Sequence, residues 1–205
     1  MIGERQFAEA RRRAGFLMPE DLLALHGEQN AILDPFSTLV SEGVEIGRDN
    51  MLYPGVVLAR HGESVLRIGS RNILFPGTLL VAEGGGSLIV GDGNHLGDGG
   101  CRMKANRGDA RIVVGSHGRY VGGTEVVGRT TLGDGTQVLG AITVQDCVLT
   151  GGMPFTAPDP DARGAVLKGF GLARGIRLDV GEVVNGAGSF ADCPVERQLS
   201  YHGRG

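Results

Sequence analysis

Cysteine is scarce in this sequence, and no two cysteines have CxxC spacing. The three that occur are Cys101, Cys147 and Cys193, an odd number that argues against a disulfide scaffold and against a zinc ribbon. No uninterrupted apolar run approaches the length of a membrane span, and the first residues contain no apolar segment of the secretory-signal kind. These absences predict a cytoplasmic protein with no membrane partner.

An excess of positive charge is also missing, since the formal net charge is −3, and the sequence therefore indicates no nucleic-acid partner. Arg11, Arg12 and Arg13 form a short basic run inside a mixed-charge segment, which we interpret as a solvated helix face. Phosphate loops, dinucleotide fingerprints and paired glycosidase-type carboxylates are absent as motifs. Composition and local motifs therefore leave the chemistry open.

Glycine, by contrast, is abundant, at 37 of 205 residues against a usual share of about 7%. There is no G-X-Y period, which excludes collagen. Similar lines of sequence begin at Ile46, Ile68, Val90 and Val114, which are 22, 22 and 24 residues apart. A period of this size indicates stacked structural repeats. Within each line, an aliphatic residue recurs every six residues.

Each beat of six residues suits a short strand and a bend, and three beats close one triangular coil. Stacked coils place parallel strands about 4.8 Å apart. The predicted inward columns are Ile46, Ile68, Val90 and Val114, and Leu52, Leu74, Leu96 and Tyr120. At the first bend, Asn50, Asn72 and Asn94 are predicted to form a hydrogen-bonded ladder with Gly118 above them.

The residues beyond three beats fall at the third corner of each coil. These segments, 59–64, 81–87 and 103–110, are predicted to stack into one ridge. Ahead of the repeats we expect a helix over 4–14, a break at Gly15, and a second helix that opens at Pro19 and stops at Gly27.

The chain is thus divided into a helical arm at 1–33, a β-helix at 34–152 and a C-terminal β or irregular extension at 153–205. In the extension, strand-like alternation on both sides of Gly181 indicates a hairpin. The Pro-rich segment at 157–161 is interpreted as a linker or turn.

Arg102 interrupts the repeat, because it occupies a phase that is inward in the preceding coils. Either it has a buried partner, or a one-residue slip turns Cys101 and Met103 inward and Arg102 outward; the cost of burying an unpaired charge favours the slip. Two outward columns are unexpectedly apolar, which indicates a partner. They contain Met51, Ile73, Tyr53 and Phe75 on the second face, and Val57, Leu79, Val81 and Met103 on the third.

The beat of an aliphatic residue, a glycine and a small residue four places on resembles the hexapeptide-repeat superfamily, over about residues 44–150. The run from Asp34-Pro35 through Val44 to Leu58 is also similar to the segment that leads into the acetyltransferase domain of bifunctional N-acetylglucosamine-1-phosphate uridyltransferases. The resemblance implies an all-β, left-handed parallel β-helix that assembles as a homotrimer. The general preference of connections between parallel strands would instead favour a right-handed coil.

Most members of the superfamily are acyl-CoA-dependent acyltransferases in which a histidine near a subunit junction acts as general base. The resemblance therefore implies acyl-CoA, such as acetyl-CoA, as co-substrate and a small-molecule acceptor of an O- or N-acyl group. Other members are scaffolds, so a non-catalytic trimeric binding protein that uses the apolar faces stays open. A few are γ-class carbonic anhydrases, but the positions of their zinc histidines are not histidine here, and no metal is expected.

The bend after Asn94 carries the strongest candidates for catalysis. His95 points outward in the column of Met51 and Ile73, and His117 lies at the same bend one coil later. We predict His95 and His117 as catalytic residues. The residues predicted to bind substrate are Asp92, Asn94, Asp98, Arg102 and Arg119. The alternative is a solvated polar bend or a subunit contact.

His61 is a third catalytic candidate, because it lies in the first inserted loop, where the superfamily often carries its base. A polar surface loop is the alternative. His26 and His202 have no motif around them and are expected on the surface. Cys101 and Cys147 are expected to be small packed residues rather than nucleophiles.

Overall fold

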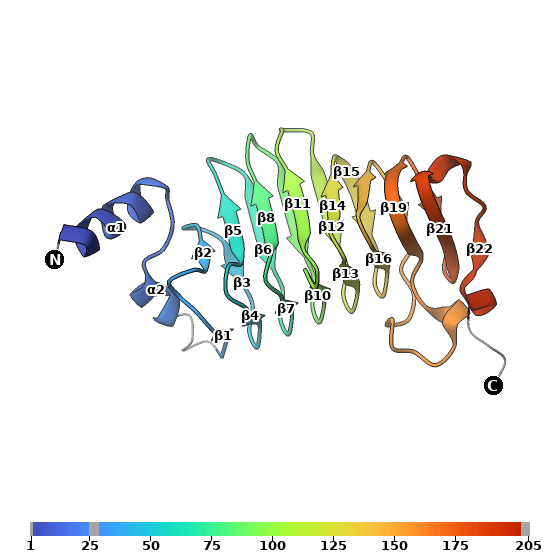
Figure 1. Ribbon diagram of the computed structural model, residues 1–205, viewed down its shortest axis with the longest axis horizontal. Coiled ribbons are helices and arrows are strands. Elements are labelled where there is room, and N and C mark those ends of the chain that lie inside the picture. The colour runs from blue at the N-terminus through green and yellow to red at the C-terminus, as the bar shows by residue number, and fades with distance from the viewer. Residues whose placement is uncertain (1, 25–28, 202–205) are drawn as a thin grey trace.

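The computed structural model describes residues 2–24 and 29–201. Its architecture is a parallel β-solenoid, with short N-terminal helices and additional C-terminal strands (Figure 1). Figure 1 shows the coils stacked between the helical arm at one end and β22 at the other. The predicted parallel β-helix is therefore confirmed.

Each coil contributes one strand to each of three faces. Face 1 contains β3 (Glu45–Ile46), β6 (Val65–Ile68), β9 (Ser87–Val90), β12 (Arg111–Val114), β15 (Arg129–Leu132), β18 (Val148–Leu149) and β20 (Arg177–Leu178). Face 2 contains β1 (Ala31–Ile32), β4 (Met51–Leu52), β7 (Ile73–Leu74), β10 (His95–Leu96), β13 (Arg119–Val121), β16 (Gln137–Leu139) and the first half of β19 (Val166–Arg174). Face 3 contains β2 (Leu39–Val40), β5 (Val57–Arg60), β8 (Thr78–Ala82), β11 (Cys101–Ala105), β14 (Thr124–Val127), β17 (Ile142–Gln145) and the second half of β19.

The inward columns form one apolar core along the axis, as predicted. Its largest fully buried side chains include Leu52, Leu74, Leu96 and Tyr120. The slip at Arg102 is confirmed, because Cys101 and Met103 are buried while Arg102 is exposed. The placement of Met103 on the outer surface of face 3 is accordingly wrong, and Arg102 pairs there with Leu79. A buried unpaired guanidinium would cost far more than a shifted phase.

The predicted asparagine ladder is present and is longer than expected. Asn30, Asn50, Asn72 and Asn94 are all buried. The Oδ1 of Asn72 accepts from the main-chain N and Nδ2 of Asn94, at 2.9 and 3.1 Å, and the lower rungs repeat this geometry. Each amide therefore ties its coil to the next through two hydrogen bonds, in a region that water does not reach.

The ladder ends at Gly118 for a steric reason. The main-chain N of Gly118 donates to Oδ1 of Asn94 at 2.8 Å. A Cβ on Gly118 would lie 2.4 Å from Oη of Tyr120, whose buried hydroxyl is hydrogen-bonded to Oγ1 of Thr136 at 2.8 Å. The tyrosine hydroxyl thus takes the space of a fifth amide, and only glycine leaves room for it.

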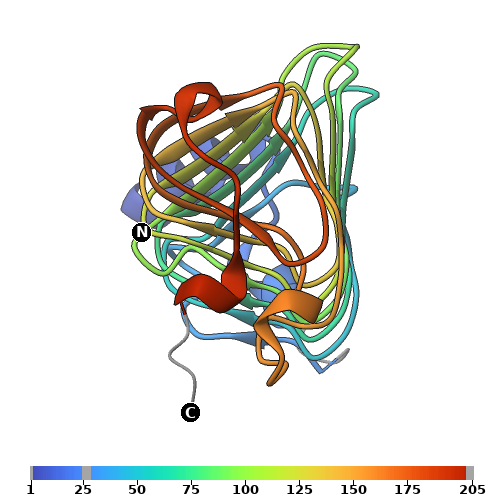
Figure 2. The same cartoon turned by 90° about the vertical axis from the view of Figure 1, so that its right-hand side faces the viewer.

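The three inserted loops form the predicted ridge at one corner, and Figure 2 shows them projecting together. The main-chain N of His61 donates to the oxygen of Ala82 at 2.9 Å, and that of Gly85 donates to Oγ of Ser64 at 3.0 Å. These bonds between successive coils hold the loops in line.

The arm consists of α1 (Ile2–Arg13) and α2 (Pro19–Ala24), and Gly15 between them has φ +75°. Both predicted helices are confirmed, while the expected stop at Gly27 lies outside the described residues. Among the described residues, no helix is long and apolar enough to cross a membrane.

The interpretation of the basic run as solvated is wrong for Arg11, which is 5% exposed, although Arg12 and Arg13 are exposed. The guanidinium of Arg11 donates to the main-chain oxygens of Leu17, Pro35, Phe36 and Thr38. Burial lowers its pKa, and Glu20 partly opposes that shift. Arg11 therefore fastens α1 to the segment that enters the solenoid.

The predicted hairpin about Gly181 is wrong. β20 lies in face 1, and β21 (Glu182–Ser189) pairs in parallel with β19, so the chain completes a further coil between the two strands. β19 continues through the second corner without a bend. Its first half pairs with β16 on face 2, and its second half pairs with β17 on face 3. The sheets thus continue past residues 152–153, and β22 (Glu196–Arg197) then closes the stack antiparallel to β21.

Replacing Asn72 by alanine tests the ladder. The main-chain N of Asn94 loses its acceptor in a buried site, and we expect a loss of about 3 kcal/mol in the free energy of unfolding, measured by urea denaturation. Asn106→Ala, at an exposed loop position, serves as the control and should change that free energy by less than about 0.5 kcal/mol. Equal losses in the two variants would contradict the assigned role.

Candidate functional site

One outward column of face 2 changes character along the axis. In register order it contains Met51, Ile73, His95, Arg119, Gln137, Val166 and Val183. The first coils therefore present apolar side chains and the middle coils present polar ones. Successive members lie about 4.8 Å apart, so His95 and Arg119 are direct neighbours.

Residues 150–165 leave the stack between β18 and β19 and fold back against face 2. Phe155 of this insertion lies edge-on to His95, with ring centroids 5.4 Å apart. The insertion is held by a bridge between Met153 and Arg163 and by a hydrogen bond of 2.7 Å from Nε of Arg163 to the oxygen of Ala157. The segment 157–161, predicted as a linker or turn, thus belongs to a longer insertion whose Phe155 and Arg163 form one wall of a pocket.

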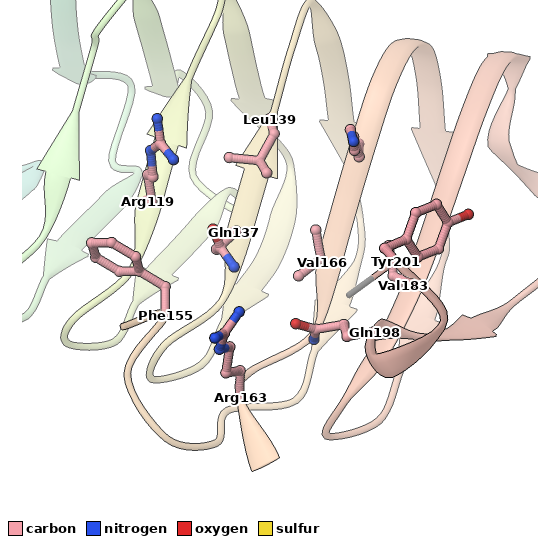
Figure 3. A pocket seen from close by; sticks show the side chains of 10 residues that line it. Arg119, Gln137, Leu139, Phe155, Arg163, Val166, Val183, Gln198 and Tyr201 are labelled. Carbon is pink, nitrogen blue, oxygen red and sulfur yellow. The ribbon is translucent and has the colours of Figure 1, made fainter. Parts of the chain in front are cut away.

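The pocket has a volume of about 320 Å³ and lies between the insertion and the 3-10 helix η4 (Gln198–Tyr201). We call it the face-2 pocket. It is lined by Arg119, Gln137, Leu139, Phe155, Arg163, Val166, Lys168, Val183, Gln198 and Tyr201. Figure 3 shows Phe155 on one side and Tyr201 on the other, with Leu139 and Val166 between them.

The face-2 pocket carries an excess of positive charge. Arg119, Arg163 and Lys168 line it, and none of the described residues on its wall has a carboxylate. Within the described part of the chain, the guanidinium of Arg119 forms no hydrogen bond or ion pair, while its main-chain N donates to the oxygen of Thr136. The interaction found for the Lys168 ammonium among the described residues is with the ring of Tyr201, where Nζ lies 5.8 Å from the centroid. The hydroxyl of Tyr201 donates to Glu196, which holds the ring in place.

His95 is not among the lining residues of the face-2 pocket, but it adjoins two of them, Arg119 in the next coil and Phe155 of the insertion. Its ring is 6.4 Å from that of Phe75 and meets Phe155 on the other side. Burial lowers the pKa of His95 below its ordinary value, and the positive charge of Arg119 lowers it further. The imidazole is therefore mostly neutral near pH 7 and can accept a proton there.

The structure does not bring the other candidate histidines to this pocket. His117 occupies a corner position with φ +59°, exposed to solvent, and an added Cβ on Gly93 would lie 2.7 Å from its Nδ1. His61 lies exposed in the ridge at the third corner. His26 and His202 lie outside the described residues.

The remaining predicted substrate-binding residues are also elsewhere or already engaged. Asn94 is buried in the ladder. Asp92 accepts from the main-chain N of Ser70 at 2.7 Å and pairs with Arg71 at 3.4 Å. Asp98 is exposed at the second corner, and Arg102 lies on face 3. Of the predicted site residues, the structure therefore brings His95 and Arg119 together.

Sequence reasoning missed the walls of the pocket. They are Phe155, Arg163, Lys168, Gln198 and Tyr201. An aromatic residue in a Gly- and Pro-rich segment that breaks the repeat was an available signal for Phe155. Lys168 would follow from extending the outward column of Leu139 into β19. Nothing in the local sequence places η4 on face 2.

Metal and thiol chemistry receive no support from the side chains. Among the described residues, no group of three or more His, Cys, Asp or Glu side chains is arranged to hold a metal ion. Cys101 and Cys147 are buried, as predicted. Burial raises the pKa of Cys101 to about 12, and it also raises that of Cys147, so both thiols stay protonated at neutral pH.

A scan against models of known protein families finds no match to this chain. A search of curated proteins likewise returns no match.

The environment of His95 can be tested by titration. Its pKa, followed by NMR of the ring protons, should lie below the ordinary 6.5. Phe155→Ala admits water and Arg119→Gln removes a positive charge, so each should raise it, whereas Arg177→Gln on face 1 should not. Because the folded-state pKa is depressed, the stability contributed by neutral His95 is complete above about pH 6.5 and declines as the pH falls below it. A pKa of His95 that is the same in Phe155→Ala and Arg119→Gln as in the unchanged protein would contradict the assigned causes.

Proposed function

We propose that this protein is an acyl-CoA-dependent acyltransferase that modifies the oxygen or nitrogen of a small molecule bound in the face-2 pocket. The observation that carries the proposal is the position of His95. His95 adjoins two residues that line the pocket, Arg119 and Phe155, and its lowered pKa leaves it neutral there. The repeat pattern adds the resemblance to a superfamily of acyltransferases.

In this proposal His95 is the general base. The neutral imidazole takes the proton that the acceptor hydroxyl or amine loses as it attacks the acyl carbon of the thioester. The carbon–sulfur bond then breaks, and the CoA thiolate leaves and takes up the proton that His95 has gained. Phe155 covers one side of the ring and limits the access of competing water. Arg119, one coil away, stabilises the negative charge that develops on the carbonyl oxygen of the acyl group, since it has no acidic partner among the described residues.

Acyl-CoA would supply the activated acyl group. The face-2 pocket, at about 320 Å³, lies at the lower end of the range for ligand pockets. It is large enough for a small acceptor but too small to hold a whole acyl-CoA in addition. The co-substrate then requires a surface beyond this pocket, and a neighbouring subunit of a homotrimer with left-handed coils is our proposal for that surface.

A non-catalytic binding protein is the second candidate. It is favoured by the lining of the pocket, which consists of arginine, lysine, glutamine, aromatic and aliphatic side chains. None of these exchanges a proton readily at neutral pH when unperturbed. Binding of a small molecule without thiol release from any acyl-CoA would favour this second function.

The acyltransferase proposal predicts the effect of replacing His95. In an assay of CoA thiol release across a panel of small-molecule acceptors, His95→Gln should lower kcat by about 10²- to 10⁴-fold. The kcat/KM of the unchanged protein should rise with pH through a pKa below the ordinary histidine value.

Matched controls are available in the other histidines. His117→Asn keeps a residue that tolerates the positive φ, and His61→Ala changes an exposed loop, so each should alter kcat by less than about threefold. Unchanged turnover in His95→Gln would refute the assignment of the base.

A further inference from the structure

We infer that the face-2 pocket binds an organic anion, in which a carboxylate or phosphate group is joined to a small apolar body. The inference rests on the proposed function in taking this pocket as the acceptor site, and it adds the chemical class of the acceptor. Its evidence is the combination of surplus cations with an apolar floor between two aromatic rings.

The charge of the pocket points to an anion. Arg119 and Lys168 lack a carboxylate partner among the described residues, although the chain as a whole has a net charge of −3. Their separation follows from the register, because Arg119 lies in β13 and Lys168 two coils further in β19, roughly 10 Å along the axis. Arg163 adds a third guanidinium, which its bond to Ala157 holds in place. An anionic oxygen group bound here would gain charge-assisted hydrogen bonds.

The floor of the pocket points to an apolar body. Val166 and Val183 face outward from their strands, yet they are only 5% and 3% exposed, because the insertion and η4 cover the face around them. Leu139 continues this apolar surface toward Arg119. Leu139, Phe155 and Tyr201 remain partly exposed around this floor. A free inorganic anion would leave them in contact with water, whereas a ligand with a ring or short aliphatic chain would bury them.

The aromatic walls fit the same class of ligand. Phe155 and Tyr201 stand on opposite sides of the floor (Figure 3), and each ring is already fixed by a contact with another residue. Gln198 is buried, and its amide donates to the oxygen of Gly164 at 2.8 Å, so η4 is anchored to the solenoid. The pocket is thus largely formed before a ligand arrives, which limits the entropic cost of binding.

Calorimetric titration of the full chain tests this inference with four probes: phenyl phosphate, benzoate, inorganic phosphate and benzyl alcohol. We expect phenyl phosphate or benzoate to bind at least about tenfold more tightly than both inorganic phosphate, which lacks the body, and benzyl alcohol, which lacks the charge. The preferred anion shows whether phosphate or carboxylate is the natural group. Binding of benzyl alcohol or of inorganic phosphate as tight as that of the better organic anion would overturn the inference.

Two pairs of variants locate the site. Arg119→Gln and Lys168→Met should each weaken binding of the preferred anion by about tenfold or more, while Arg177→Gln on face 1 and Lys104→Met on face 3 should leave it unchanged. Thermal melts would verify that all four variants fold. Equal affinity in the pocket variants and their controls would place the anion elsewhere and refute the inference.

The titrations contain no acyl donor, so the binding of the probes does not depend on catalysis. Anion binding without thiol release from any acyl-CoA would retain the inference and reject the acyltransferase function. Acyl transfer to neutral acceptors alone, with no binding of the anionic probes, would retain the acyltransferase function and reject the inference.

Discussion

The structure depends on the hydrogen bonding between successive coils, because polar groups buried at the interior have to find their partners within the protein. Parallel strands satisfy the main chain on the faces, but the first corner bends away from strand geometry. There the buried amides of Asn50, Asn72 and Asn94 supply the missing donors and acceptors. By fixing the spacing and phase of each coil, this ladder also fixes which side chains stand next to one another outside.

Much of the architecture could be predicted because a repeat expresses the same physical requirement many times. The inward columns, the ladder and the ridge all follow from the period and from the side preference of alternating residues. Arg11 could not be placed in this way, since its acceptors are main-chain oxygens that carry no sequence signature. The coil built by β19, β20 and β21 was missed because the insertion at 150–165 shifts the period and β19 lacks a corner.

The candidate site was predictable only in part, because some of its residues belong to the repeat and others do not. His95 and Arg119 belong to one outward column, and a column can be read from the period. Asp92, Asn94 and His117 also depart from the apolar pattern, but the corner itself uses them, through hydrogen bonds or a left-handed backbone conformation. The walls come from segments far away in the sequence that contact face 2 through single, non-repeating interactions. Polar residues in a repeat therefore divide into those that build the corner and those left facing outward.

The position of η4 has a consequence for the integrity of the stack. An open parallel sheet edge is a template for pairing with another chain. Here β22 covers the start of β21, and Phe190 of η3 (Phe190–Asp192) is buried beside its end, so the terminal strand is shielded at both points. The chain that leads from this shield continues into η4, which forms one wall of the face-2 pocket. A ligand that binds this pocket in the folded protein would therefore also stabilise η4 and the cover over β21, and would make the protein more resistant to aggregation.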